Sequence, residues 1–344
     1  MNRRKFIHNI STTATAGLIC PSLFLKNKPY YKDLIIGHNS HQYKIDLNWG
    51  TLDKQKYPVK DCHEMIQDSK GRIVLLTNHI KNNILIYNKR GILINAWGND
   101  FPGAHGLTLS VEDGKDYLFI TDTERHEVIK TTIDGKVVMQ IPFPQESEKY
   151  SLANQYLPTE TAIAANGDIY VADGYGLQYI IHYNHKGELQ NIFGGKGKGN
   201  SNFDNAHGIC IDNRKQEATL LVTARIQNKL KRFSMQGKYI ESIALPGAFI
   251  CRPVIKNKHV YLATIWSAEG SANTGFISIL NEENKLTSAP GGSKPIYADN
   301  QLVKMHQTIK VFQHPHDVCI DEDENLYIAQ WNAGQTYPIK LYRV

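Results

Sequence analysis

The sequence predicts an all-β protein that folds as one six-bladed β-propeller. Three observations predict it: a repeat of roughly 45 residues, four short alternating strands in each repeat, and very little helical periodicity. The chain has 344 residues, more than one compact core usually serves, and a ring of blades accommodates that length. Closing the ring also removes sheet edges that would otherwise be open to aggregation.

Each repeat begins with a short apolar strand. A second strand follows, as in DIYVAD, and a third carries Tyr or Lys before a glycine turn, as in NILIYNKRG. A fourth strand ends in an aromatic residue and glycine, as in NAWG. One anchor position precedes each first strand, and its occupants in chain order are His63, His105, Thr159, His207, Arg252 and His316.

The sixth repeat supplies only about three strands before Val344. A spare strand near the start, Tyr43 to Gly50, ends like the fourth strands of the repeats, so we expect it to complete the sixth blade and close the ring. The propeller domain is then residues 35–344, after a linker at 29–34. Seven blades are an alternative that would use Ala268 to Lys310. That insertion is rich in Gly, Ser and Asn, and we interpret it as a loop.

The first 28 residues predict an export signal of the twin-arginine type. Arg3 and Arg4 precede a mildly apolar run rich in Ser, Thr and Ala that ends at Cys20. The mature protein is then periplasmic or extracellular. A disordered basic tail is the alternative, and the residues before Cys20 make a poor lipid-attachment box. No apolar run reaches the roughly 18–20 residues of a membrane span.

Charge argues against a nucleic-acid partner. Residues 1–28 hold five basic and no acidic residues, so their removal lowers the net charge from +6 to +1. Phosphate binding needs concentrated positive charge, which the remaining chain lacks. We therefore expect a small-molecule or peptide substrate, and a monomer. The cysteines after the signal are far apart without a C-x-x-C pair, which favours buried free thiols, although a disulfide stays open: Cys62, Cys210, Cys251 and Cys319.

The anchor histidines point to a metal site. Innermost strands of a propeller line its axis, so anchors in alternate blades lie about 120° apart and converge. His105, His207 and His316 occupy repeats two, four and six. Three imidazoles with one open position are typical of catalytic zinc. His63 lies between two of them as a further ligand or a supporting residue. The alternative is that each histidine only hydrogen-bonds a backbone carbonyl.

AHGL, AHGI and PHDV in alternate repeats, with VADGYG between them, resemble the peptidyl-α-hydroxyglycine α-amidating lyase family. The resemblance covers the chain from about Cys62 onward, and it extends to exported bacterial propellers related to that lyase. It implies a six-bladed propeller of NHL-type repeats that holds zinc on three histidines. It also implies cleavage of peptidyl-α-hydroxyglycine to a peptide amide and glyoxylate.

The resemblance implies roles for further residues. Tyr175 would be the catalytic base, and Arg225 would hold a substrate carboxylate. A structural calcium would be bound by the backbone oxygens of Met65 and Leu107 and the carboxylate of Asp317.

Two positions depart from the family pattern. Asn78, followed by His79, stands where the lyases have an essential arginine, and His314 replaces a methionine. Neither Asn78 nor His79 provides the permanent positive charge and the paired N–H donors of an arginine guanidinium. We expect Arg252 to supply the missing charge from another blade, and His306 and His314 to be surface or supporting residues.

These observations predict an exported, zinc-dependent propeller enzyme, a carbon–nitrogen lyase acting on a small polar or carboxylate-bearing substrate. A non-catalytic propeller that binds a protein or glycan through its loops is the alternative, because propellers host many functions. A lactonase-type hydrolase is a third reading, but such propellers usually bind calcium through Glu, Asn and Asp rather than histidine. The sequence leaves the substrate and the metal open.

Overall fold

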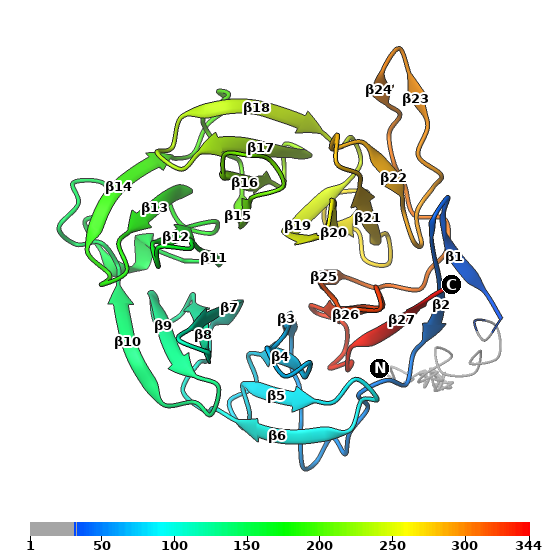
Figure 1. Cartoon of the computed structure of the whole chain (residues 1–344), viewed down its shortest axis with the longest axis horizontal. Coiled ribbons are helices and arrows are strands. Elements are labelled where there is room, and N and C mark those ends of the chain that lie inside the picture. The colour runs from blue at the N-terminus through cyan, green and yellow to red at the C-terminus, as the bar shows by residue number, and fades with distance from the viewer. Residues whose placement is uncertain (1–30, 32) are drawn as a thin grey trace, which may run out of the picture.

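A computed structural model describes residue 31 and residues 33–344, and the predicted signal, including Cys20, lies outside them. Six β-sheets surround a central channel, as Figure 1 shows down the axis, and the predicted six-bladed propeller is confirmed. A short 3-10 helix, η2 (Ala153–Gln155), lies in the connection between the second and third blades. No helix among the described residues is long and apolar enough to cross a membrane.

The first five blades are four-stranded, antiparallel sheets in chain order from the axis outward. Blades one and two contain β3 (Cys62–Gln67), β4 (Ile73–Thr77), β5 (Ile84–Tyr87), β6 (Leu93–Trp97), β7 (Ala104–Glu112), β8 (Lys115–Asp122), β9 (Glu127–Thr132) and β10 (Val137–Pro142). Blades three and four contain β11 (Glu160–Ile163), β12 (Ile169–Ala172), β13 (Tyr179–Tyr183), β14 (Leu189–Gly194), β15 (Ala206–Asp212), β16 (Thr219–Ala224), β17 (Lys229–Ser234) and β18 (Tyr239–Ala244). Blade five contains β19 (Phe249–Lys256), β20 (His259–Trp266), β21 (Phe276–Leu280) and β22 (Leu286–Ser288).

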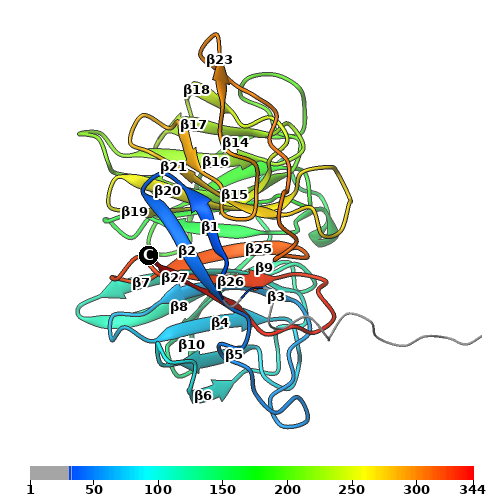
Figure 2. The same cartoon turned by 90° about the vertical axis from the view of Figure 1, so that its right-hand side faces the viewer.

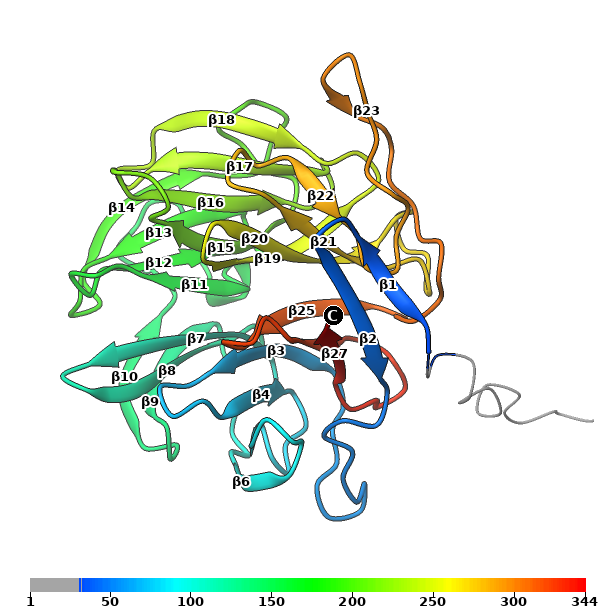
Figure 3. The same ribbon diagram turned by 45° about the vertical axis from the view of Figure 1, so that its right-hand side comes forward.

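The sixth blade joins both ends of the described chain, as predicted. Its order from the axis is β25 (Pro315–Ile320), β26 (Leu326–Gln330), β27 (Ile339–Arg343), β2 (His41–Asp46) and β1 (Ile35–His38). Tyr43 pairs with Arg343 in this closure. The closing strand begins two residues before the predicted one. β1 adds an unpredicted fifth strand that pairs with β2 (Figure 2) and lies beside β22 of blade five (Figure 3).

The interpretation of Ala268 to Lys310 as a loop was wrong. The segment contains β21 and β22, which complete blade five, and a small hairpin of β23 (Tyr297–Ala298) and β24 (Gln301–Leu302) that projects from the ring in Figure 1. All five residues of β21 are buried, so this strand lacks the polar alternation that marks a half-exposed strand. The surrounding Gly, Ser and Asn residues hid it.

The cores lie between neighbouring blades. In the core between blades one and two, Val74 and Leu76 of β4 pack with Leu118 and Ile120 of β8. Every blade therefore depends on its neighbours, which fixes the innermost strands around the channel.

Five of the six innermost strands carry a register shift at the anchor, for example between Ala104 and Leu107 and between Pro315 and Asp317. The exception is β11, whose pairing with β12 is continuous. A bulge bends the strand and redirects its side chains. Two successive residues, such as His316 and Asp317, can then both face the channel.

The bulges also explain glycine after histidine in blades two and four. A Cβ on Gly106 would lie 2.6 Å from the carbonyl oxygen of Thr159, and one on Gly208 would lie 2.5 Å from Cα of Arg252. Both distances are shorter than a side chain tolerates, so the neighbouring strand can approach this closely only at glycine.

Candidate metal centre and catalytic site

The bulges bring four histidines together near the axis. The ring centroids of His105, His207 and His316 lie 4.8–4.9 Å from one another, so the three predicted ligands converge from alternate blades. His63 joins them, with centroid distances of 4.6 Å to His105 and 4.9 Å to His316. All four residues are buried.

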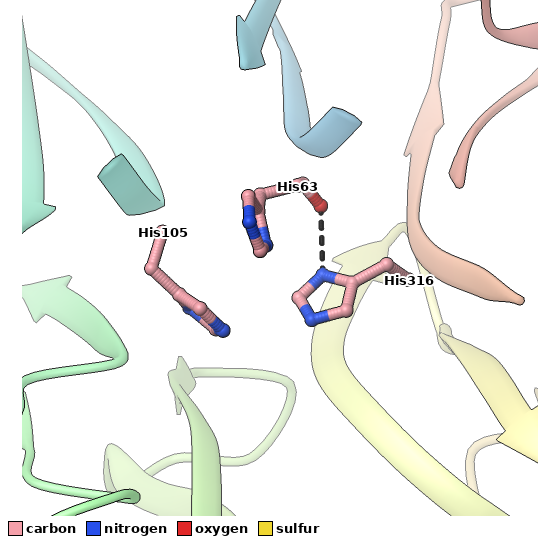
Figure 4. Close-up of side chains that lie close together, drawn as sticks. All are labelled: His63, His105 and His316. Carbon is pink, nitrogen blue, oxygen red and sulfur yellow. Dashed lines mark hydrogen bonds between the residues drawn. The ribbon is translucent and has the colours of Figure 1, made fainter. Parts of the chain in front are cut away.

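Two sets of three side chains each have potential ligand atoms that lie within 4.8 Å of one another, and His316 belongs to both sets. One is His63, His105 and His316, whose rings point toward one another in Figure 4. The other is His207, Cys251 and His316. Sequence reasoning missed Cys251 because repeat five has no histidine, and we placed its anchor on Arg252. The structure puts Cys251 with the histidines and Arg252 one position further along the channel.

The channel side chains therefore form two layers. The histidine layer contains His63, His105, Thr159, His207, Cys251 and His316. The arginine layer contains the residues that follow each of these: Glu64, Gly106, Glu160, Gly208, Arg252 and Asp317.

Hydrogen bonds orient two of the imidazoles for metal binding. Nδ1 of His105 lies 2.8 Å from the carbonyl oxygen of Thr159, and Nδ1 of His316 lies 2.9 Å from that of His63 (Figure 4). A ring that donates from Nδ1 presents a lone pair at Nε2, which is the form that binds metals. Among the described residues, Nε2 of His316 is buried and has no hydrogen-bond partner. This unpaired atom and the nitrogen donor set fit a zinc ion.

The histidines are in the neutral form that metal ligation requires. Burial lowers the pKa of His105, His207 and His316 well below the usual value, and neighbouring histidines and Arg225 act in the same direction. Burial also lowers the pKa of His63, to about 3. No proton has to leave these rings at neutral pH before an ion binds.

Tyr175 reaches the histidines from the loop between β12 and β13. Its hydroxyl oxygen lies 3.1 Å from Nε2 of His105 and 3.1 Å from Nε2 of His207. The residue as a whole is 43% exposed, because its ring faces a cavity while its hydroxyl points inward. Burial of the hydroxyl raises the pKa of Tyr175, and the charge of Arg225 opposes that shift.

The Asp173 carboxylate builds the Tyr175 loop. It accepts hydrogen bonds from the backbone N–H groups of Leu157 and Leu177, at 2.7 Å each, and from the Tyr150 hydroxyl at 2.7 Å. Because these donors come from three separate segments, they fix the loop and with it the direction of the tyrosine.

Arg225 is buried beside this tyrosine without a carboxylate partner. The residue is 4% exposed, and its guanidinium donates to Sγ of Cys251 at 3.1 Å and to the carbonyl oxygen of Ile250 at 3.4 Å. No acidic group of the described residues lies within ion-pair distance of it. An uncompensated buried charge is costly, so this arrangement is typical of a site that binds an anion.

A cavity of about 450 Å³ opens above Tyr175 and Arg225. Trp266, at the end of β20, and Trp331, just after β26, provide its aromatic surface, and Asp204 and Glu269 provide acidic groups. His314 is buried between the two indoles, with centroids 6.3 Å from Trp266 and 5.5 Å from Trp331, so it supports the cavity wall. His306 is exposed. The volume and lining are those of a small-molecule or peptide-end site.

Comparison with known proteins identifies the relatives of this chain. A probable peptidyl-alpha-hydroxyglycine alpha-amidating lyase of Caenorhabditis elegans is 38% identical over 339 residues, which cover 94% of this chain and 85% of the relative. The chain belongs to the peptidyl-α-hydroxyglycine α-amidating lyase family. Peptidyl-alpha-hydroxyglycine alpha-amidating lyase 1 of Drosophila melanogaster is 37% identical over 111 residues, 29% of this chain and about a fifth (19%) of that protein.

Other comparisons agree on the fold. A family described as a 6-bladed beta-propeller matches residues 160–327. A streptogramin B lyase structure superposes with a TM-score of 0.54 at 15% identity, covering 83% of this chain and 94% of that one. A virginiamycin B lyase from Staphylococcus aureus gives a TM-score of 0.51 at 16% identity, covering 82% and 80%.

Asn78 stands where the amidating-lyase pattern has an arginine. Its amide nitrogen lies 3.5 Å from Nε2 of His63 and 3.1 Å from a carboxylate oxygen of Asp61. The side chain therefore reaches the edge of the histidine layer but carries no charge. His79 lies beside it, where Nδ1 accepts from the backbone N–H of Lys81.

Arg252, which we expected to supply that charge, lies in the arginine layer. Its guanidinium donates to the carbonyl oxygen of Leu107 at 2.8 Å, to that of Met65 at 2.9 Å, and to both carboxylate oxygens of Asp317 at 2.7 and 3.1 Å. Four of its five N–H groups are thereby used. Arg252 also lines a separate cavity that does not include Tyr175 or Arg225. The structure thus brings Arg225, not Arg252, to the cavity above the histidines.

The same contacts bear on the implied calcium ion. The three oxygen donors implied for it, on Met65, Leu107 and Asp317, all accept hydrogen bonds from Arg252. A cation cannot share these oxygens with a guanidinium already in contact with them. As arranged, these residues do not fit calcium.

Proposed function

We propose that this protein is a zinc-dependent carbon–nitrogen lyase that cleaves peptides ending in α-hydroxyglycine to a peptide amide and glyoxylate. One observation carries the proposal: the Tyr175 hydroxyl lies between two imidazoles of a four-histidine cluster, next to the unpaired Arg225. The names of the amidating-lyase relatives support the same reaction.

Each residue at the site has a role in this reaction. Arg225 binds the carboxylate of the hydroxyglycine, which supplies the missing counter-charge and orients the substrate. Tyr175 acts as the base in its tyrosinate form, which the positive charge of a bound zinc ion would favour against the effect of burial, and takes the proton of the substrate hydroxyl as the C–O bond becomes the carbonyl of glyoxylate. The C–N bond breaks, its electron pair passes to the amide nitrogen, and that nitrogen gains a proton.

His105, His207 and His316 would hold the zinc, with His63 as a further ligand or support. A zinc ion there supplies a Lewis acid for the reacting oxygen. Imidazole ligation leaves the ion's positive charge intact, which favours oxygen anions nearby.

The cavity wall indicates what precedes the hydroxyglycine. Trp266 and Trp331 offer apolar surface, whereas Asp204 and Glu269 would repel an acidic side chain. A substrate with an apolar residue at that position therefore fits this cavity better than one with Asp or Glu. We also propose that the protein is exported, on the basis of the twin-arginine pattern in residues 1–28, and that it acts as a monomer.

The decisive experiment measures metal content and glyoxylate release for the purified protein and for His207→Ala, with the exposed His306→Ala as the matched control. We expect about one zinc per chain and glyoxylate from an acyl-Phe-α-hydroxyglycine substrate, both lost in His207→Ala and kept in His306→Ala. A folded wild-type protein without a transition metal would overturn the zinc centre. Metal without glyoxylate release would retain the centre and overturn the reaction.

A further inference from the structure

The arginine layer contains three acidic residues, two glycines and one arginine: Glu64, Glu160, Asp317, Gly106, Gly208 and Arg252. We propose that Arg252 is a built-in cation that takes the place of a calcium ion at the centre of the ring, and that its removal turns this layer into a calcium site. The inference does not depend on the proposed reaction.

The contacts of Arg252 connect blades around the channel. From blade five, its guanidinium donates to Met65 of blade one, Leu107 of blade two and Asp317 of blade six. The carboxylate of Glu160, from blade three, lies 3.6 Å from Nε. A single side chain of blade five thus contacts four other blades, which is the geometric role of a central metal ion.

The surrounding charge is that of a cation site. Carboxylate oxygens of Glu64 and Glu160 lie 3.4 and 3.6 Å from the guanidinium, and that of Asp317 lies 2.7 Å away. Three carboxyl groups therefore face one guanidinium. Burial raises the pKa of Glu64 and of Glu160, and their mutual repulsion contributes to the shift of Glu64.

The glycines let the innermost strands of neighbouring blades approach each other closely around the arginine layer. A Cβ on Gly208 would meet the Arg252 backbone at 2.5 Å, and one on Gly106 would meet the neighbouring Glu160 backbone at 3.0 Å. Glycine has no side chain, so Gly106 and Gly208 place no side-chain atoms at the centre of the layer, where the Arg252 guanidinium lies. The six residues of the layer therefore include only one cationic side chain.

Without the guanidinium, the same groups become a hard-oxygen site. Two backbone carbonyls and up to three carboxylates would face the vacated centre, and calcium takes six to eight oxygens with flexible geometry. Magnesium needs a smaller, near-octahedral set and retains its water, so it should bind poorly. Histidine-layer nitrogens do not compete, because calcium prefers oxygen.

The test compares wild type with Arg252→Ala in thermal unfolding with EGTA, with 5 mM calcium and with 5 mM magnesium, together with equilibrium dialysis for bound calcium. We expect the wild-type midpoint to be the same in all three and to find no stoichiometric calcium. Arg252→Ala should melt lower in EGTA, regain about 5 °C or more with calcium but not magnesium, and bind about one calcium.

Two further variants keep the test decisive. Asp317→Asn in the Arg252→Ala background should abolish the calcium response, because it removes the central carboxylate charge. If Arg252→Ala folds only when calcium is present during refolding, that dependence supports the proposal equally. Stoichiometric calcium in the wild type, with a lower melting midpoint in EGTA, would overturn it. An Arg252→Ala protein that folds and ignores calcium would overturn it too.

Discussion

The histidine layer and the arginine layer lie one residue apart on the same strands, yet they are opposite in character. In the arginine layer, oxygen atoms surround a cation that the chain itself supplies. In the histidine layer, nitrogen lone pairs and a tyrosine hydroxyl converge, and Nε2 of His316 has no hydrogen-bond partner among the described residues. Within the described part of the chain, Oε2 of Glu160 in the arginine layer also has no hydrogen-bond partner, but it lies 3.6 Å from Nε of Arg252, whereas His316 faces other imidazoles. A buried polar atom without a partner requires a functional explanation.

The two buried arginines repeat the contrast. Arg252 faces three carboxylates, and burial of such a network without its cation would be severely unfavourable. Arg225 faces a thiol and a carbonyl oxygen and opens toward a cavity. Arg252, which is paired with carboxylates of the chain itself, is therefore structural, whereas Arg225, which has no such partner among the described residues, is available to a substrate.

Adjacent substitutions on β25 give the largest expected effects. His316→Ala should abolish metal binding and activity while the protein still folds, because a ligand is lost and no buried ion pair is broken. Asp317→Ala should lower the free energy of unfolding by about 3–5 kcal/mol, because it leaves Arg252 without its closest partner. Denaturant unfolding and metal analysis of both variants test this. If Asp317→Ala were as stable as wild type, the structural role of the arginine layer would be wrong.

Tyr175→Phe sharpens the contrast within the histidine layer. It removes only the hydroxyl that lies 3.1 Å from two imidazoles. We expect kcat to fall by about 10²–10⁴, the usual contribution of a general base, with metal content and melting temperature unchanged. Steady-state glyoxylate release measures it. Loss of the metal in this variant would instead make the tyrosine a positioning residue for the ligands.

Arg225→Met tests whether the unpaired arginine binds the substrate. The side chains have similar length, so the cavity should persist, while kcat/KM falls about 10²-fold or more because the carboxylate loses its charged partner. Arg225→Lys serves as the control that keeps the positive charge but not the paired N–H donors of the guanidinium, and it should recover part of the lost kcat/KM. Equal activity of Arg225→Met and wild type would refute the anion site.

Trp266→Ala should give the smallest effect, a reduced preference for apolar side chains next to the hydroxyglycine. We expect the ratio of kcat/KM for Phe and Asp substrates to fall about tenfold, in line with loss of one apolar contact surface. Exposed Tyr342→Ala, on the outer part of blade six, is a matched aromatic control that should leave the ratio unchanged. An unchanged ratio in Trp266→Ala would mean that the substrate side chain next to the hydroxyglycine does not contact Trp266.

Periodicity was sufficient for the fold and for part of the site. The repeated order of four short strands predicted six blades, and the need to cover the open sheet edge of the last blade predicted closure by an N-terminal strand. The convergence of His105, His207 and His316 followed from their equivalent positions in alternate blades. Such inferences need only the repeat and its symmetry.

The remaining features depend on contacts that periodicity does not encode. Cys251 was missed because repeat five has no histidine to mark the anchor, which was therefore assigned one residue too late, to Arg252. The partners of Arg252 are up to 187 residues away in sequence, and only the assembled ring shows which of them its side chain reaches. The strand β21 was missed because complete burial removes polar alternation.

The pairing of β2 with β27 makes a linear chain behave as a circle. Four residue pairs, from Tyr43–Arg343 to Asp46–Lys340, form the latch between the two ends. Separation of β2 from β27 would expose a sheet edge in blade six. It would also open the ring, so that the packing of each blade against its neighbours would no longer be closed on itself. Mechanical or proteolytic opening should therefore begin there. A circularly permuted gene whose new ends lie between blades three and four would convert the latch into an ordinary internal blade, with the weak point moved to the opposite side of the ring.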